Sequence, residues 1–444
     1  MARIKEIWKN WYFFIIVLIV VMISEKINII TIPVGIGSIM FLPLLYAMVI
    51  MLGLYLIKPF KLVGKAQEGI SGALVVTGIS VFIAKVSVVS GVALQQVIEA
   101  GPALLLQELG NLGTIFVALP VALLLGFKRE AVGMTHSIAR EPNVGIIATK
   151  YGLDSPEGEG VITIYVVGTL IGTIFMGLLA SLLASGTGLH PLSLAMATGV
   201  GSGSMMAAAS APLVEMFPKM ADEITAFAAT SNVLSTADTT IVTIFIGLPL
   251  CNWLYKKLEP KIGREPVLKK KKTVSAKSFE SDEGTLPDAK DQTKGAQILE
   301  MIIIVLITAC IAYIGNYIYS DGAITFSAGF WGMVILVGIA IAGDILGILI
   351  PKVPSIIWIT IIGILLGMSY SPTAAVIVPY VDKIQMLPMA TPILAYAGVT
   401  MGKNWEDFKN IGWRGIVVAC CTMFGTFIGS ALIAQLVLSL TGVI

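Results

Sequence analysis

The chain has 444 residues, of which 56% are hydrophobic and only 13% charged, and its mean hydropathy is +0.91. Soluble globular proteins carry about 25% charged residues, so this composition excludes a soluble enzyme, a nucleic-acid-binding protein and a secreted disulfide scaffold. The net charge of +2 identifies no partner, because local loop charge is what matters in a membrane protein. Apolar runs of about 17–25 residues recur from end to end, and each can cross a bilayer. The sequence therefore predicts an all-α, polytopic integral membrane protein.

No motif of a membrane enzyme or an ATP-driven pump is present in the sequence. The chain holds only two histidines and four cysteines, namely His136, His190, Cys251, Cys310, Cys420 and Cys421. The cysteines show no CxxC spacing and lie in apolar runs, which is typical of small packing residues. Walker A, HExxH and GxSxG patterns do not occur in the sequence. We expect no catalytic residue, no metal site and no bound cofactor.

The first apolar run follows a short basic segment and is expected to stay in the mature chain. Arg3, Lys5 and Lys9 precede Trp11–Ile23, and no small-residue cleavage site comes after that run. The positive-inside rule then places the N-terminus in the cytoplasm. Further spans are expected at about Val34–Ile57, Ile70–Leu94, Asn111–Phe127, Val161–Ser185, Ala221–Tyr255, Ile298–Tyr319, Phe330–Ile350, Ile356–Tyr370, Ile384–Met401 and Trp413–Leu438. These runs predict a bundle of ten to twelve spans.

Residues 191–216 do not fit a simple count of spans. The run GVGSGS at 199–204 interrupts this apolar segment, and the most basic loop of the protein follows Tyr255. If both 191–216 and Ala221–Tyr255 crossed fully, that loop would be external and would break the positive-inside rule. A re-entrant hairpin at 191–216 removes the conflict. Splitting 221–255 into two crossings is the alternative, but each would then have only about 17 residues.

A hydrophilic segment divides the chain. Residues 256–297 are rich in Lys, Glu, Ser, Asp and Pro, which predicts a solvated cytoplasmic linker between a membrane half at 1–255 and another at 298–444. Four consecutive lysines at 269–272 are expected to lie near anionic lipid headgroups, with a specific lipid or protein site as the alternative.

The glycine-rich interruption is the first candidate binding site. A broken helix survives in a membrane only where protein or a water-filled cavity supports it, and transporters use such breaks to bind ligands. Freed backbone amides and serine hydroxyls can coordinate a ligand there. The residues predicted to form this part of the site are Gly199, Gly201, Ser202, Gly203 and Ser204. The alternative is close helix packing through small residues.

The second candidate is a polar helix face that precedes an apolar run. At helical spacing Ser231, Ser235 and Asp238 share a face, with Asn232 adjacent. A carboxylate beside hydroxyls and an amide can hold Na⁺ or a proton-coupled substrate; a hydrogen-bond network between helices is the alternative. Asp344 is a lone carboxylate in an apolar run, and it either belongs to the site or reaches the membrane interface.

Residues 135–143, THSIAREPN, form a polar loop beside the end of a span. Arg140 could clamp a carboxylate, and His136 could titrate near neutral pH. Together with Asn143, these residues are expected to form a gate or a substrate contact. Equally, Arg140 and Glu141 could form a capping pair that shapes the turn before Pro142.

Several stretches resemble one bacterial family of multi-pass membrane proteins that is known as a domain of unknown function. They are GPALLLQELGNLGTIFVALPVALLLG (101–126), THSIAREPN (135–143), KYGLDSPEG (150–158), HPLSLAMATGVGSGSMMAAAS (190–210) and FAATSN (227–232). The likeness covers most of residues 30–255 and implies no substrate. A weaker likeness extends to bacterial lysine exporters and other inverted-repeat secondary carriers. It implies an inverted-repeat architecture with substrate bound near the midplane. The extra spans and the 256–297 linker depart from the lysine exporter pattern, so lysine is not inherited as the substrate.

These observations favour a secondary transporter of the bacterial inner (cytoplasmic) membrane for a small polar metabolite, either a carboxylate or an amino acid. Na⁺ or H⁺ is the expected coupling ion, since no nucleotide-binding motif occurs in the sequence. The expected partners are the lipid bilayer and the substrate, and no nucleic acid is expected. The sequence leaves open whether the protein forms a homodimer. A non-transporting membrane sensor or assembly protein that signals through the basic linker is the alternative from another functional class.

Overall fold

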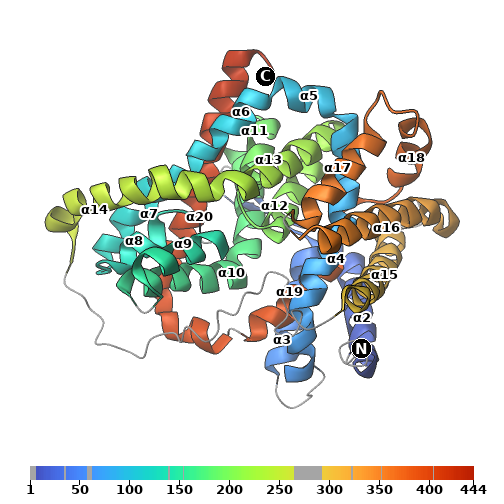
Figure 1. Cartoon of the computed structure of the whole chain (residues 1–444), viewed down its shortest axis with the longest axis horizontal. Helices are drawn as coiled ribbons and strands as arrows, with labels where there is room; N and C mark the ends of the chain where they lie inside the picture. The colour runs from blue at the N-terminus through green and yellow to red at the C-terminus, as the bar shows by residue number, and fades with distance from the viewer. Residues whose placement is uncertain are drawn as a thin grey trace. The chain divides into compact units, whose positions relative to one another are not determined.

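The computed structural model describes residues 7–34, 37–57, 63–138, 141–153, 155–264, 293–321, 324–351, 353–403 and 405–444, and most of them are helical (Figure 1). Three sequence predictions lie outside the described residues: Arg140, the lysines at 269–272 and the side chain of Asp238.

Six helical segments in the described part of the chain are long and apolar enough to cross a membrane. They are Ile70–Val92, Gly101–Leu124, Pro156–Gly186, Lys294–Tyr319, Phe326–Leu349 and Ile411–Thr441. The pair Ala374–Val381 and Met386–Gly402 is also apolar enough, but it bends by 63° at its break, which is the geometry of a broken span or of a re-entrant loop. The protein is therefore a helical membrane protein, as the composition predicts.

The predicted total of ten to twelve full spans is not reached in the described part of the chain. Several predicted spans are shorter than about 18 residues. The helix expected to cover Val34–Ile57 is only Pro43–Leu56, and the one expected at Ile356–Tyr370 is only Ser355–Gly367. At about 1.5 Å per residue, helices of 13 or 14 residues fall short of the hydrocarbon core.

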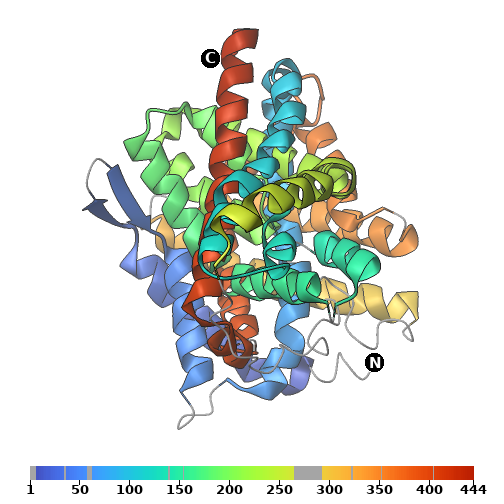
Figure 2. The same cartoon turned by 90° about the vertical axis from the view of Figure 1, so that its left-hand side faces the viewer.

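A β-hairpin replaces the start of one predicted span. Strands β1 (Ile30–Val34) and β2 (Gly37–Phe41) pair antiparallel, with Ile30 opposite Phe41 (Figure 2). The expected helix does not form here because β-branched residues dominate β1 and Pro33 would interrupt helical hydrogen bonding. The fold class is thus helical with one small hairpin.

The chain forms two compact units. The first comprises Met1–Ile98, Val214–Ala229 and Ser281–Lys403, and the second comprises Glu99–Leu213, Thr230–Glu280 and Asn404–Ile444. Both units draw on chain from before and after the 256–297 segment. The predicted division into halves at that segment stays a prediction about membrane organisation.

In the first unit, helices pack around aromatic and aliphatic side chains. Its complete elements are α2 (Trp11–Ile27), β1, β2, α3 (Pro43–Leu56), α4 (Lys65–Val92), α15 (Lys294–Tyr319), α16 (Phe326–Leu349), α17 (Ser355–Gly367), α18 (Ala374–Val381) and α19 (Met386–Lys403). α5 (Leu94–Glu99) falls at its boundary. Phe13 and Tyr396 are both fully buried, with ring centroids 6.1 Å apart. This core joins α2, α3, α4, α15 and α19.

The break between α18 and α19 is held by two buried polar side chains. Lys85 Nζ donates to Val381 O at 3.1 Å and lies 3.5 Å from Asp382 Oδ1. Asn316 Nδ2 donates to Lys383 O at 3.2 Å, and Asn316 Oδ1 accepts from the Gln385 amide at 2.8 Å. Lys85 and Asn316 therefore satisfy backbone groups that the helix break would otherwise leave without partners.

The second unit is built around the long helix α20. Its elements are α6 (Gly101–Leu106), the 3-10 turn η1 (Gln107–Leu112), α7 (Gly113–Leu124), α8 (Glu130–Thr135), α9 (Glu141–Tyr151), α10 (Pro156–Gly186), α11 (Pro191–Thr198), the π-turn η3 (Thr243–Gly247), α14 (Leu248–Ile262) and α20 (Trp405–Thr441). Helices α12 (Gly203–Met216) and α13 (Ala221–Val242) contribute to both units, as does the chain at the short turn η2 (Pro218–Met220) between them. α14 continues through Ile262, so the segment predicted as a linker begins inside a helix.

Glycines bring η1 and α7 against the backbone of α20. A Cβ added at Gly110 would lie 2.2 Å from Ser430 N, and one added at Gly113 would lie 2.3 Å from Gly425 O. Only residues without a side chain permit this approach. The segment Gly101–Leu124 is one interrupted span, whereas the sequence prediction started this span at Asn111, after its polar residues.

The interrupted segment 191–216 reverses its direction. His190 N and Ser193 Oγ both donate to Gln435 Oε1, at 2.9 and 2.8 Å, so α11 starts near the C-terminal end of α20. α12 then runs beside α10 in the direction of α10, since Gly172 approaches Met205 and Gly177 approaches Ala208. α11 and α12 are thus arranged as the two arms of a hairpin, with their break at residues 199–202.

Candidate functional site

Asn232 on α13 holds the broken backbone between α11 and α12. Its Nδ2 donates to Gly199 O at 2.9 Å and to Gly201 O at 2.8 Å. Asn232 is 6% exposed, and the hydrogen bonds to these two carbonyls satisfy groups that the break frees from helical pairing. The structure therefore brings together Gly199, Gly201 and Asn232 from the two candidate segments.

Ser231 connects the same break to a second interrupted helix. Its fully buried hydroxyl donates to Met196 O at 2.7 Å and accepts from Gln107 Nε2 at 3.0 Å. Gln107 begins the 3-10 turn η1 inside the span Gly101–Leu124. Two interrupted helices of the second unit, α6–η1–α7 and α11–α12, are thereby joined through one residue of α13.

The η1 turn carries a buried carboxylate between two amides. Gln107 Nε2 donates to Glu108 Oε1, and Asn111 Nδ2 donates to Glu108 Oε2 at 2.9 Å. Gln107, Glu108 and Asn111 are 0, 1 and 5% exposed. We name this group, together with Ser231 and Asn232, the broken-helix cluster.

Gln107, Glu108 and Asn111 were not predicted as site residues. From the sequence, Gln107 and Glu108 were expected to precede a span that starts at Asn111, whereas the span runs through all three residues. The available signal was a carboxylate flanked on both sides by apolar runs, in residues 101–124.

Three oxygen atoms in this region of the second unit lack hydrogen-bond partners among the described residues. They are Gln107 Oε1, Asn111 Oδ1 and Ser235 Oγ, and each is fully shielded from solvent. The amide NH₂ groups of Gln107 and Asn111 face Glu108, so their carbonyl oxygens are the atoms left to accept. A cation or the ammonium group of a ligand is the chemistry that would satisfy such acceptors.

Ser202 and Ser204 do not join the broken-helix cluster through their side chains. Their hydroxyls lie 3.1 Å apart, and Ser202 Oγ accepts from the Met205 amide at 3.3 Å at the start of α12. Both are half-buried, as is Gly203. They form the tip of the hairpin and cap its second arm.

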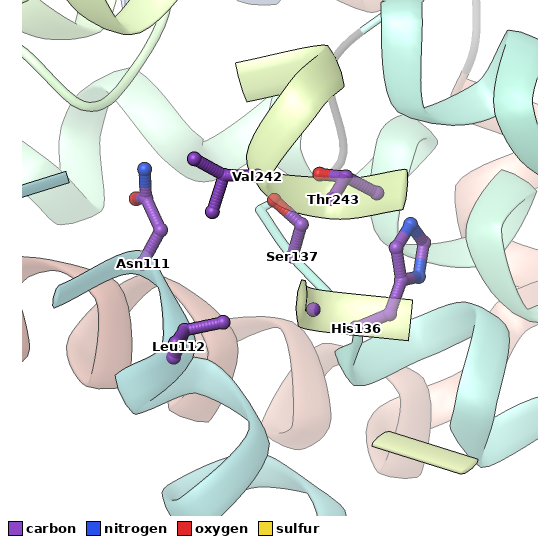
Figure 3. A pocket seen from close by; sticks show the side chains of 7 residues that line it. Asn111, Leu112, His136, Ser137, Val242 and Thr243 are labelled. Atoms are coloured by element: carbon purple, nitrogen blue, oxygen red, sulfur yellow. The ribbon is translucent and has the colours of Figure 1, made fainter. Parts of the chain in front are cut away.

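A small cavity lies beside the cluster, next to residues of the predicted gate. Its volume is about 10 Å³, which suits a single water molecule. Figure 3 shows Asn111 and His136 on opposite sides of it, with Ser137 and Thr243 between them. The remaining lining residues are Leu112, Val242 and Gly247.

Asn143 fixes the polar side of this cavity. Its Nδ2 donates to Ser137 Oγ at 3.1 Å and to Ile138 O at 2.6 Å, and its Oδ1 accepts from Thr243 Oγ1 at 3.0 Å. These three hydrogen bonds are within the second unit, and Asn143 is fully buried. Asn143 is therefore a positioning residue for the loop that carries His136.

His136 is a buried, neutral side chain. Its Nδ1 lies 3.0 Å from Gly133 O and 3.2 Å from Val132 O, so Nδ1 carries the proton. Nε2 has no partner among the described residues. Burial lowers the pKa of His136 from 6.5 to about 4, so this side chain does not titrate near neutral pH in the folded state.

We expect His136 to make the protein sensitive to acid. Between pH 6.5 and about 4 the unfolded chain binds a proton at His136 and the folded protein does not. The free energy of unfolding then falls as pH falls, by about 1.4 kcal/mol per pH unit and ~3 kcal/mol in all. Melting temperatures of wild type and His136→Gln between pH 7.5 and 4 test this. The variant should lose less stability over that window, and equal losses would contradict it.

Asp344 lies in the first unit, with a different set of neighbours. It is 6% exposed on α16, and hydroxyls of Ser80 on α4 and Ser355 on α17 hydrogen-bond to its carboxylate. Its second oxygen, Oδ2, has no partner among the described residues. Asp344 is therefore buried within the first unit, and its role in the site stays a prediction.

One family model matches the chain, over residues 22–257, and its description is a protein of unknown function (DUF3100). The match covers the region that carries the motifs quoted above. A search of curated proteins and a search of solved structures each gave no match. The chain therefore belongs to the DUF3100 family.

Proposed function

We propose that the protein is an ion-coupled secondary transporter that carries a small polar metabolite, a carboxylate or an amino acid, across the cytoplasmic membrane. One observation carries the proposal. Two interrupted helices of the second unit are joined through Gln107 and Ser231 at a buried polar cluster. Interrupted helices with polar groups at membrane depth are how secondary carriers bind substrates and ions.

The balance of donors and acceptors supports an amino acid over a simple carboxylate. Glu108 supplies a carboxyl group between two amides, while Gln107 Oε1 and Asn111 Oδ1 have no hydrogen-bond partner among the described residues. These groups suit an ammonium group. A carboxylate group would need donors, and backbone amides at the break between α11 and α12 are the candidates within the same unit. An amino acid presents both groups at once.

A thermal-shift screen of the detergent-purified full chain tests binding. The probes are amino acids, dicarboxylates and hydroxycarboxylates at millimolar concentration, with and without Na⁺. A ligand at 100 times its Kd adds about 2.7 kcal/mol to the free energy of unfolding. We expect an amino acid to raise the melting temperature of wild type.

Two variants of the cluster and one matched control locate the binding. Glu108→Gln removes the charge while keeping the size, and Ser231→Ala removes the link between the two interrupted helices. Thr149→Ala changes an exposed residue of the same unit whose hydroxyl donates to Gly145 O in its own helix. Stabilisation should be lost in the two variants and kept in the control. Stabilisation that survives in both variants, or is absent in wild type for every probe, would contradict the proposal.

A further inference from the structure

Glu25 is a buried carboxyl group that the function proposed above does not use. It lies in the last turn of α2, beyond the apolar run Trp11–Ile23 and outside the segments long enough to span a membrane. Its side chain is 1% exposed, and neither carboxyl oxygen has a hydrogen-bond partner among the described residues. A negative charge in the last turn also opposes the helix dipole, so the position disfavours an ionised carboxylate.

No described cation compensates for Glu25. The adjacent Lys26 extends to Asp321, 3.6 Å away, and both side chains are exposed. Of the helices packed on α2, α3 has no charged residue, and α19 has only Lys403 at its far end. The end of α15 that lies against Glu25 contributes Gly315 and Tyr319. Burial without an opposite charge raises the pKa of Glu25 to about 8.

The hydroxyl of Thr391 can accept a hydrogen bond from a protonated Glu25. Thr391 on α19 lies beside the carboxyl group, and its hydroxyl donates to Leu387 O at 3.2 Å. With that hydrogen in use, Thr391 Oγ1 can only accept. A protonated Glu25 can donate to it, whereas an ionised Glu25 would meet a lone pair.

A second carboxylate lies across a tyrosine from Glu25. Tyr319 OH donates to Glu215 Oε1 at 2.9 Å, and Tyr319 also interacts electrostatically with Glu25. Glu215 is half-buried, so it is closer to solvent than Glu25. Burial raises the pKa of Glu215 as well. Glu215 and Tyr319 thus offer a route by which a proton reaches Glu25.

We propose that the coupling ion is a proton and that Glu25 carries it, with Tyr319 and Glu215 as the relay. The proposal rests on the transport function above and names its energy source. Na⁺ fits less well, because hard cations take about six oxygen ligands, whereas the hydroxyls that interact with this carboxyl among the described residues are those of Thr391 and Tyr319. Loss of the proton would place a charge against α19, whose break from α18 is held by Asn316 of α15.

Infrared difference spectroscopy of the purified full chain tests the proton site directly. Between pH 6 and pH 10 the wild type should lose a protonated carboxyl band with a midpoint at about pH 8. Glu25→Gln, which resembles the protonated side chain in shape and charge, should lack that band and fold normally. Asp321→Asn, a change of an exposed carboxylate in the same unit, should retain it.

Three results would overturn the proton site. They are the absence of the band at pH 6, its persistence at pH 10, and its presence in Glu25→Gln. This measurement needs no substrate and no transport. If the band behaves as expected and no transport is found, the transport function fails while the proton site stands.

A flux measurement then tests coupling. Where wild type in proteoliposomes accumulates an amino acid under an imposed pH gradient, Glu25→Gln should still exchange it but no longer accumulate it. Accumulation by Glu25→Gln equal to wild type, or accumulation driven only by a Na⁺ gradient, would overturn the assignment of the proton to Glu25.

Discussion

Replacing Asn232 by alanine is expected to lower the free energy of unfolding by about 2–4 kcal/mol. The change removes the hydrogen bonds that Asn232 donates to Gly199 O and Gly201 O, both in a buried break between helices. Asn232→Asp should cost at least as much, because it keeps the size but turns a carboxylate toward two carbonyl oxygens. Thermal unfolding of the purified variants measures the loss.

Ser210→Ala is the matched control for Asn232. Ser210 is also fully buried in the second unit, but its hydroxyl bonds to Ala207 O within its own helix, α12. Helical carbonyls already have backbone partners, so this change should cost less than about 1 kcal/mol. Equal costs for the two positions would show that Asn232 does not hold the break.

Gly199→Ala is expected to destabilise the protein by about 2–4 kcal/mol and to abolish ligand binding. A Cβ at this position would lie 2.4 Å from Ser231 Oγ and 2.6 Å from Asn232 N. The second of these atoms belongs to the backbone of α13, which cannot move aside as a flexible side chain could. The substitution therefore separates the hairpin from the two residues that hold it.

Gly145→Ala, in the same unit, is expected to stabilise the protein, whereas Gly199→Ala is expected to destabilise it. Gly145 lies in α9, and a Cβ there would meet nothing within 4 Å. Alanine is the better helix former, so we expect a gain of about 0.5–1 kcal/mol. Melting temperatures of both variants, with binding measured by thermal shift, check the pair. A Gly199→Ala protein as stable as Gly145→Ala would contradict the described packing of α13 on the break.

Much of the candidate site could be predicted because membrane helices make polar residues conspicuous. The run GVGSGS inside an apolar segment predicts a break, and the structure has one at residues 199–202. Ser231 and Asn232 stand out as polar residues on one helix, and they contact that break. The reason is that hydrocarbon leaves few places for freed carbonyls and amides to find partners.

Other parts of the site could not be predicted from chain order. Gln107 reaches Ser231 only because α6–η1–α7 packs within the same unit as this part of α13, more than a hundred residues later in the chain. Periodicity gives no information about such contacts. It also placed Glu108 outside a span, because a helix that changes to a 3-10 turn keeps no constant apolar face.

Helix lengths were the weakest part of the sequence prediction. Apolar composition alone extended one span back to Val34, where the chain forms a β-hairpin. The sequence did not predict a site at Glu25 either, because it shows only a polar residue at the end of an apolar run. Only the packing of α15 and α19 on α2 reveals that this carboxyl is buried.

The most direct test of transport through the broken-helix cluster is to measure charge movement by the full chain, in proteoliposomes adsorbed on a solid-supported membrane. Rapid addition of the amino acid that stabilises the protein should give a transient current in wild type, and Glu108→Gln should abolish it while Thr149→Ala keeps it. No current in wild type with a compound that binds, or the same current in Glu108→Gln, would contradict transport through the broken-helix cluster.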